Sequence, residues 1–294
     1  MKKNIRTELG EIVFDCVNIL VNLFLMLIIL LPLLSILFST VSDPVEVMKQ
    51  EGLMLYPKGF NLGAYRAVLK NPNILSGYMN TIFIVIAGTT INILLSLIGA
   101  YVLSRKGTVW VWPLTMLLIF TMYFSGGTIP FYLTVRTVGL DGSLWALILP
   151  TAISTFNLII MRTAMAAVPD SLPESAMIDG ASHFKTLFFI MVPLTKATVA
   201  VLVLYYAVGH WNSWFNAMIF LRNKKLFPLQ LILREILIQD NTSSMTSENL
   251  MDLGFVAETI KYATIVVATA PILCIYPVLQ RYFVKGVMIG AVKG

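Results

Sequence analysis

Successive apolar runs, each about long enough to cross a lipid bilayer, constrain the fold of this 294-residue chain more than any other feature. A transmembrane helix needs about 20 apolar residues to cross a hydrocarbon core about 30 Å thick. The pattern predicts an all-α integral membrane protein with six spans, near residues 19–38, 76–103, 110–124, 143–161, 197–221 and 262–282. We expect residues 1–294 to form a single transmembrane domain.

The composition agrees with a membrane environment. Hydrophobic residues make up 57% of the chain and charged residues only 12%, whereas soluble domains carry about a quarter charged residues. The net charge of +6 would suggest nucleic acid in a soluble protein. No basic patch is interleaved with exposed aromatic residues here, so the cations are expected in loops facing lipid headgroups, and no nucleic-acid partner is expected.

The ends of the first span indicate its orientation. Lys2, Lys3 and Arg6 precede the first apolar run, which is too long for a signal peptide and has no small-residue cleavage site after it. We therefore expect an uncleaved span with a cytoplasmic N-terminus. Six spans place the C-terminus and the short Arg105–Lys106 loop on the same side, as the positive-inside rule prefers. The long loops 39–72 and 222–258, expected outside, hold nearly as many cations, so charge alone does not fix the orientation.

Cysteine and histidine give no support for metal chemistry. Cys16 and Cys274 lie in separate apolar runs and are interpreted as small buried hydrophobic residues rather than a disulfide or metal pair. His183 and His210 have no ligand spacing to each other or to the cysteines. We expect no metal site and no cofactor bound by this chain.

One polar segment, residues 169–193, has a pattern of its own between the fourth and fifth spans. Ser171 and Glu174 have the spacing of a capping box, which predicts a short helix from Leu172 to about Asp179. Gly180 is expected to supply a turn, and Ser182 to cap a second short helix to about Met191. Taken alone, such a segment could simply lie on lipid headgroups.

The residues of this segment resemble a known motif. Glu174-Ser175-Ala176, then Asp179-Gly180-Ala181, followed by Phe184, Ile190 and Pro193, are similar to the EAA loop of bacterial ATP-binding-cassette (ABC) importer permeases. Ser175 replaces the usual alanine, and Ala197 stands where many relatives have a second proline. In that family the loop forms a coupling helix that docks in a cleft of a cytoplasmic ATPase subunit. The resemblance implies this role for Glu174, Ser175, Ala176, Asp179, Gly180, Ala181 and Ser182.

Further motifs resemble the carbohydrate branch, specifically the second permease of maltose-type systems in the subgroup associated with oligosaccharides and polysaccharides. They are Tyr56-Pro57-Lys58-Gly59-Phe60, Gly127-Thr128-Ile129-Pro130, Gly139-Leu140, Gly209-His210-Trp211-Asn212, Phe227-Pro228-Leu229-Gln230 and the tail Lys285-Gly286 to Lys293-Gly294. The resemblance implies a sugar importer in the bacterial cytoplasmic membrane that works by alternating access. Its implied partners are a homologous permease, two ATPase copies and an extracytoplasmic solute-binding protein.

ATP hydrolysis is not expected from this chain itself. No glycine in the sequence is followed by lysine, so the G-x-x-x-x-G-K-[ST] phosphate-binding loop is absent. ATP and Mg²⁺ are therefore expected on the partner ATPase. The alternatives are a permease for another solute class, a secondary transporter that works alone, and an intramembrane lipid-modifying enzyme; the last two leave segment 169–193 unexplained.

Polar residues inside the spans are candidates for the substrate path, because placing them in lipid is costly. They are Asn80, Asn92, Asn157, His210, Asn212 and Asn216. We expect the path to include Asn157, His210, Trp211, Asn212 and Trp214, because aromatic faces stack on sugar rings and amides bond hydroxyls. Hydrogen bonding between helices explains the polar residues as an alternative, and an aromatic belt at the membrane surface explains the tryptophans.

Overall fold

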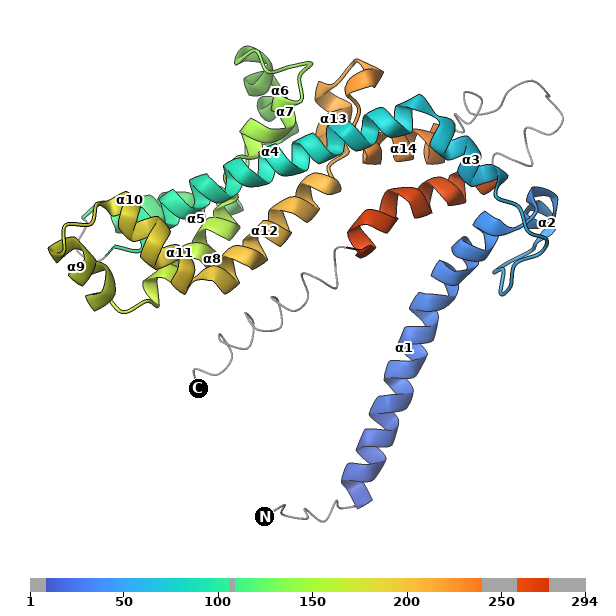
Figure 1. Cartoon of the computed structure of the whole chain (residues 1–294), viewed down its shortest axis with the longest axis horizontal. Coiled ribbons are helices and arrows are strands. Elements are labelled where there is room, and N and C mark those ends of the chain that lie inside the picture. Colours follow the sequence, from blue (N-terminus) through green and yellow to red (C-terminus); the bar gives the residue numbers. More distant parts are fainter. Residues whose placement is uncertain (1–8, 106–108, 240–257, 275–294) are drawn as a thin grey trace. The chain divides into compact units, whose positions relative to one another are not determined.

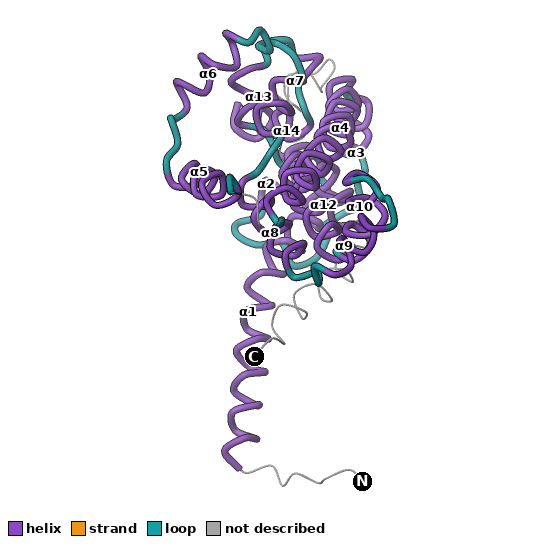
Figure 2. The backbone as a smooth tube through the Cα atoms, turned by 90° about the vertical axis from the view of Figure 1, so that its left-hand side faces the viewer, coloured by secondary structure: helices purple, strands orange, loops and turns teal. Residues whose placement is uncertain are grey.

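The computed structural model describes residues 9–105, 109–239 and 258–274, and every regular element in these ranges is a helix (Figures 1 and 2). The described chain divides into two compact units. Unit 1 comprises residues up to Asn71 and Ile236–Val267, and unit 2 comprises Pro72–Glu235 and the residues from Ala268 onward. The basic residues before residue 9, residues 240–257 of the second long loop and the C-terminal tail lie outside the described residues.

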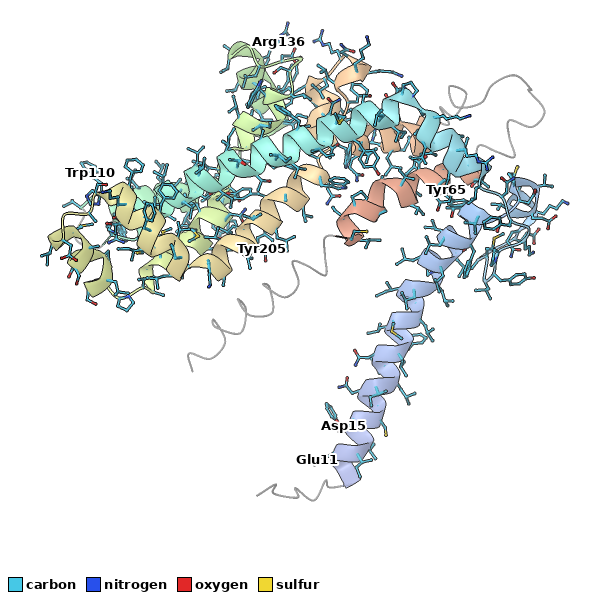
Figure 3. The ribbon with its side chains drawn as sticks, viewed as in Figure 1. Glu11, Asp15, Tyr65, Trp110, Arg136 and Tyr205 are labelled. Atoms are coloured by element: carbon cyan, nitrogen blue, oxygen red, sulfur yellow. The ribbon has the colours of Figure 1, made fainter. Side chains whose placement is uncertain are left out.

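Unit 1 is built on one long apolar helix. Helix α1 (Leu9–Val41) is followed by the short helices α2 (Pro44–Lys49) and α3 (Gly63–Lys70). Asp43 caps α2 by accepting a hydrogen bond from the Val45 backbone N–H at 2.9 Å. The apolar side chains of α1 are exposed along most of the helix, and side chains project from either side of it in Figure 3. A helix that is hydrophobic all round needs lipid or another protein around it.

Unit 2 is organised around α4 (Pro72–Leu103), which packs against α8 (Thr155–Ala166) and α12 (Lys196–Trp211). Its other helices are α5 (Val111–Tyr123), α6 (Thr128–Thr137), α7 (Trp145–Ile148), η1 (Leu149–Thr151), α9 (Ser171–Ile178), α10 (His183–Thr186), the π-helical η2 (Leu187–Met191), α11 (Val192–Leu194), α13 (Phe215–Phe220), η3 (Lys224–Leu226) and α14 (Leu229–Gln239), whose last residues belong to unit 1. Residues 258–274 are also helical.

The apolar core of unit 2 joins α4 to the elements around it. Its buried residues are Leu97, Ala100, Tyr101, Leu103, Leu158, Met161, Met165, Leu187, Met191 and Leu202. Arg162 adds a polar contact, because its Nε donates to the Leu103 carbonyl oxygen at 3.0 Å and so satisfies the end of α4. This packing fixes the segment around residues 183–191 on the C-terminal end of α4.

The membrane character is confirmed, whereas the count of six spans stays a prediction. Among the described residues two helices, Gly10–Val41 and Pro72–Ser104, are long and apolar enough to cross a bilayer. Three bent helix pairs would raise this number to five if each forms one span. Residues 275–282 of the predicted sixth span lie outside the described residues.

Two predicted continuous spans are broken, which corrects the sequence interpretation. The run 143–161 bends by 48° between Thr151 and Thr155, where Ser154 leaves the helical conformation and caps α8. The run 197–221 ends as a helix at Trp211 and resumes only at Phe215. The predicted third span matches α5 to within one residue at each end, and the chain then turns at Gly127, whose φ is +84°.

The two cysteines also differ from the prediction. Cys16 in unit 1 and Cys274 in unit 2 are free, and both are exposed rather than buried. Both lie on helices whose outer faces no other described element covers, so a small apolar residue there faces the surroundings of the chain.

Candidate functional site

The turn of segment 169–193 has a defined backbone structure. Helix α9 ends at Ile178 with Asp179 as its C-cap residue, and Gly180 takes a left-handed φ of +84°. The Ala181 N–H bonds to the Ala176 carbonyl oxygen at 2.9 Å, and the Gly180 N–H bonds to that of Met177 at 3.0 Å. These two bonds form a Schellman motif, in which glycine is favoured because a Cβ is strained at positive φ. The predicted turn at Gly180 is confirmed.

Of the two predicted helix caps in this segment, one is confirmed and one is wrong. Ser182 caps α10, accepting from the Lys185 N–H at 3.4 Å as predicted. The capping box of Ser171 and Glu174 is wrong, because the N-cap residue of α9 is Asp170. Ser171 is already helical, and its carbonyl oxygen accepts from the Ser175 hydroxyl at 2.8 Å. Pro173 fits either register, since a proline in the first turn removes no helical hydrogen bond.

The candidate coupling residues form an exposed surface. Glu174, Ser175, Asp179, Gly180 and Ser182 are exposed, and Ala176 and Ala181 are partly exposed. Two large apolar side chains accompany them, Ile178 at 86% and Phe184 at 67% exposure. Phe184 belongs to the motif that resembles the EAA loop, whereas sequence reasoning did not select Ile178. Exposed apolar residues interspersed with small and charged ones are typical of a surface that another protein covers.

This surface is attached firmly to α4. Thr186, the last residue of α10, and Leu187, the first residue of η2, are buried. The Tyr101 hydroxyl on α4 lies 3.1 Å from Nδ1 of His183, and the two rings meet edge to face at 6.0 Å. The start of α10 is therefore in direct contact with the C-terminal end of α4.

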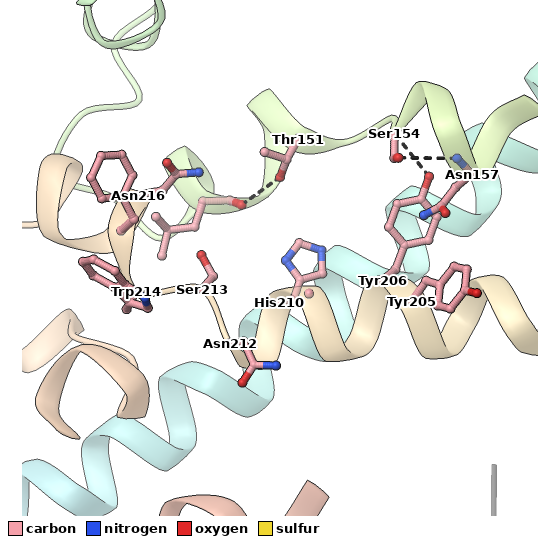
Figure 4. A pocket seen from close by; sticks show the side chains of 13 residues that line it. Thr151, Ser154, Asn157, Tyr205, Tyr206, His210, Asn212, Ser213, Trp214 and Asn216 are labelled. Atoms are coloured by element: carbon pink, nitrogen blue, oxygen red, sulfur yellow. Dashed lines mark hydrogen bonds between the residues drawn. The ribbon is translucent and has the colours of Figure 1, made fainter. Parts of the chain in front are cut away.

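A polar pocket of about 410 Å³ lies between α12, the break before α8 and the residues that follow α12 (Figure 4). It is lined by Leu147, Thr151, Ser154, Asn157, Tyr205, Tyr206, Gly209, His210, Asn212, Ser213, Trp214, Phe215 and Asn216. No Asp, Glu, Lys or Arg is among the described residues that line it. Aromatic rings beside amides and hydroxyls are the groups that hold a sugar ring by stacking and hydrogen bonding.

A hydrogen-bond network from α4 holds the pocket wall in place. His210 Nε2 donates to Asn92 Oδ1 at 2.6 Å, and Asn92 Nδ2 donates to the carbonyl oxygens of Thr151 and Ala152, both at 2.8 Å. The Tyr206 hydroxyl lies 2.8 Å from Ser96 Oγ and accepts from the Ser154 N–H at 3.2 Å. The broken backbone before α8 is thus satisfied by side chains of α4 and α12, as buried polar groups must be.

The structure brings together four of the five predicted path residues. Asn157, His210, Asn212 and Trp214 line the pocket. Trp211 does not: it is 7% exposed and packs edge to face on Tyr78 of α4 at 6.3 Å. One residue along a helix is a rotation of about 100°, so the neighbour of a pocket residue turns into the core.

Several pocket residues were not found from the sequence. Tyr205 and Tyr206 come from the apolar part of α12, and Thr151, Ser154 and Ser213 come from the helix breaks. The only available signal was the polar interruption of two apolar runs. The predicted polar residue Asn80 lies elsewhere, where its Nδ2 donates to the carbonyl oxygens of Lys225 and Phe227 at 2.8 and 3.1 Å.

Comparison with known proteins gives close relatives. No profile of a protein family matches the sequence. The chain is 39% identical over 272 residues to the polygalacturonan/rhamnogalacturonan transport system permease protein YtcP of Bacillus subtilis (strain 168), covering 91% of this chain and 94% of that protein. It is also 39% identical over 288 residues to protein LplC of the same organism, covering 98% and 97%.

A solved structure agrees with these relatives. The chain matches one chain of the crystal structure of a bacterial ABC transporter involved in the import of the acidic polysaccharide alginate. The TM-score is 0.87 at 29% sequence identity, covering 94% of this chain and 98% of that chain.

Proposed function

Because this chain belongs to the permease subunits of carbohydrate ABC importers, we propose that segment 169–193 couples it to a separate ATPase and that the polar pocket forms part of its sugar path. The chain is a multi-pass membrane protein and not the ATPase of its complex. Glu174, Ser175, Ala176, Asp179, Gly180, Ala181 and Ser182 meet the ATPase. Asn157, His210, Asn212 and Trp214 meet the sugar.

The working complex holds a second homologous permease, two ATPase subunits and an extracytoplasmic solute-binding protein. ATP and Mg²⁺ bind to the ATPase subunits, and this chain binds no cofactor. Residues 1–294 act as one transmembrane domain with six spans and both termini in the cytoplasm. Closure of the ATPases moves the coupling segment, and the pocket faces alternately outward and inward.

The substrate is a sugar chain released from a polysaccharide. Two observations support this proposal: YtcP, one of the two 39% identical relatives, is a polygalacturonan/rhamnogalacturonan transport system permease, and the matching structure comes from an ABC transporter involved in alginate import. The pocket of about 410 Å³ holds only a few sugar units at a time. A longer chain therefore passes through it lengthwise.

The observation that carries the coupling proposal is that α4 contacts both sites. Asn92 on α4 bonds to His210 at the pocket, and Tyr101 on the same helix contacts His183 beside the coupling surface. The two positions are nine residues apart on one continuous helix. A shift of the coupling segment is thus carried to the pocket wall through a single rigid element.

Sugar uptake by a Trp214→Ala transporter tests the pocket. Trp214 lines the pocket and is 37% exposed, so its truncation removes a stacking face without opening the core. We expect uptake to fall at least tenfold, equivalent to about 1.4 kcal/mol of lost binding, with assembly and basal ATP hydrolysis intact. Trp112→Ala, at a 70% exposed tryptophan of α5 outside the pocket, is the matched control. Equal uptake by both variants would show that sugar does not contact this pocket.

A further inference from the structure

A second cavity, of about 330 Å³, lies between the C-terminal end of α4 and the start of α10. Its apolar wall comes from Ile98 and Val102 of α4 together with Phe184 and Leu187. None of these residues lines the polar pocket. The cavity is therefore a separate site beside the coupling segment.

The other part of its lining is polar and cationic. The Arg105 guanidinium lies over the Tyr101 ring, 4.4 Å from its centroid, and the Tyr101 hydroxyl contacts Nδ1 of His183. Arg105 Nε is buried and has no hydrogen-bond partner among the described residues. No carboxylate is among the described residues that line the cavity. A guanidinium beside an apolar wall, with no acceptor for its Nε among the described residues, is a suitable donor for an anionic group.

We propose that this cavity binds one anionic phospholipid, with its phosphate on Arg105 and His183 and the start of an acyl chain on Ile98, Val102 and Leu187. When the Tyr101 hydroxyl donates to Nδ1 of His183, the Nε2–H of that ring is a second donor for the phosphate. The lining joins a cationic end to an apolar wall, which matches a lipid and not a free phosphate. The bilayer around α4 supplies such lipids continuously, and basic pockets beside transmembrane helices bind their headgroups.

Occupation of the cavity has a consequence for coupling, which rests on the proposed function. Arg105 and Tyr101 belong to α4 and its end, whereas His183 and Leu187 belong to the segment that carries the coupling surface. A lipid bound to both holds the coupling segment against α4. Anionic lipid is therefore expected to raise sugar-stimulated ATP hydrolysis.

Native mass spectrometry of the assembled, delipidated transporter, titrated with phosphatidylglycerol, tests the binding. We expect Arg105→Gln to retain one phosphatidylglycerol fewer than wild type. Lys196→Gln removes an exposed cation at the start of α12, outside the cavity, and should retain as many as wild type. Val102→Trp fills the apolar part and should also lose one lipid while the complex still assembles. Wild-type retention in Arg105→Gln or Val102→Trp, or an equal loss in Lys196→Gln, would overturn the proposal.

Two further experiments identify the ligand and distinguish a failure of the lipid site from a failure of the proposed function. Glycerol phosphate, which has the headgroup phosphate but no acyl chain, should not displace the bound lipid; displacement at matched concentration would overturn the lipid assignment. In nanodiscs, adding phosphatidylglycerol to phosphatidylcholine should raise sugar-stimulated ATP hydrolysis in wild type and Lys196→Gln but not in Arg105→Gln. Lipid binding at Arg105 without any such rise would overturn the effect on coupling, and the binding site itself would stand.

Discussion

At the scale of single residues, the pocket depends on a glycine that faces His210. A Cβ built on Gly88 would lie 2.5 Å from His210 Nε2, the atom that bonds to Asn92. We expect Gly88→Ala to push the imidazole off Asn92, with an overpacking cost of about 1–3 kcal/mol and a large loss of sugar uptake. On the same helix, a Cβ at Gly99 would meet only the end of the flexible Leu158 side chain at 3.0 Å. Thermal unfolding and uptake of Gly88→Ala against Gly99→Ala check this, and equal behaviour would contradict the role of Gly88.

Trp211 and Trp214, the two tryptophans that follow His210, are predicted to behave differently. Trp211 is buried against Tyr78, so Trp211→Ala should leave a cavity costing about 3–5 kcal/mol. We expect a lower yield of assembled complex from Trp211→Ala, in contrast to Trp214→Ala. Size-exclusion chromatography of the purified complexes measures this. A fully assembled Trp211→Ala transporter that has lost only sugar uptake would restore Trp211 to the sugar path.

At the scale of elements, α4 sets the distance between the two loop regions it contacts. Asn80 near its start bonds to the carbonyls around η3, and Tyr101 near its end contacts His183. These positions are 21 residues apart, about 32 Å along a helix, which matches a hydrocarbon core about 30 Å thick. We expect a cysteine at Lys185 to be labelled only from the cytoplasm and one at Lys224 only from outside. Labelling of intact cells and of inside-out vesicles measures the accessibility of the two cysteines. Labelling of both positions from the same side would contradict the predicted topology.

Some features of these elements could be predicted from the sequence alone, and others could not. The ends of α5, the turn at Gly180 and the cap at Ser182 follow from local rules, and all three were predicted correctly. The breaks before α8 and after Trp211 were missed, because their backbone groups are satisfied by residues far along the chain, such as Asn92 and Tyr206. A mean hydropathy taken over a window of residues does not reveal such short breaks in a helix. The pocket residues Tyr205 and Ser154 were missed for the same reason, since only the tertiary contacts bring them together.

At the scale of the whole molecule, the exposed apolar surface indicates a subunit within a larger membrane complex. The side chains of α1 are exposed along most of its length, and Ile178 and Phe184 are exposed on the coupling surface. Lipid suffices for a transmembrane helix, but a surface that mixes Glu174 and Asp179 with large apolar residues fits a protein partner better. The central claim is therefore that ATP hydrolysis elsewhere in the complex reaches the sugar through segment 169–193.

Binding-protein-stimulated ATP hydrolysis by the reconstituted complex carrying Gly180→Val tests this claim most directly. Valine at a φ of +84° strains the Schellman turn by about 1–3 kcal/mol and adds a side chain to the docking surface. Gly139→Val is the matched control, because Gly139 has a φ of +79°, has equally open space around it, and lies far from the coupling segment in sequence. We predict that Gly180→Val assembles but loses stimulated hydrolysis and sugar uptake together, whereas Gly139→Val keeps both. Stimulated hydrolysis at the wild-type rate in Gly180→Val would contradict the coupling role of this segment.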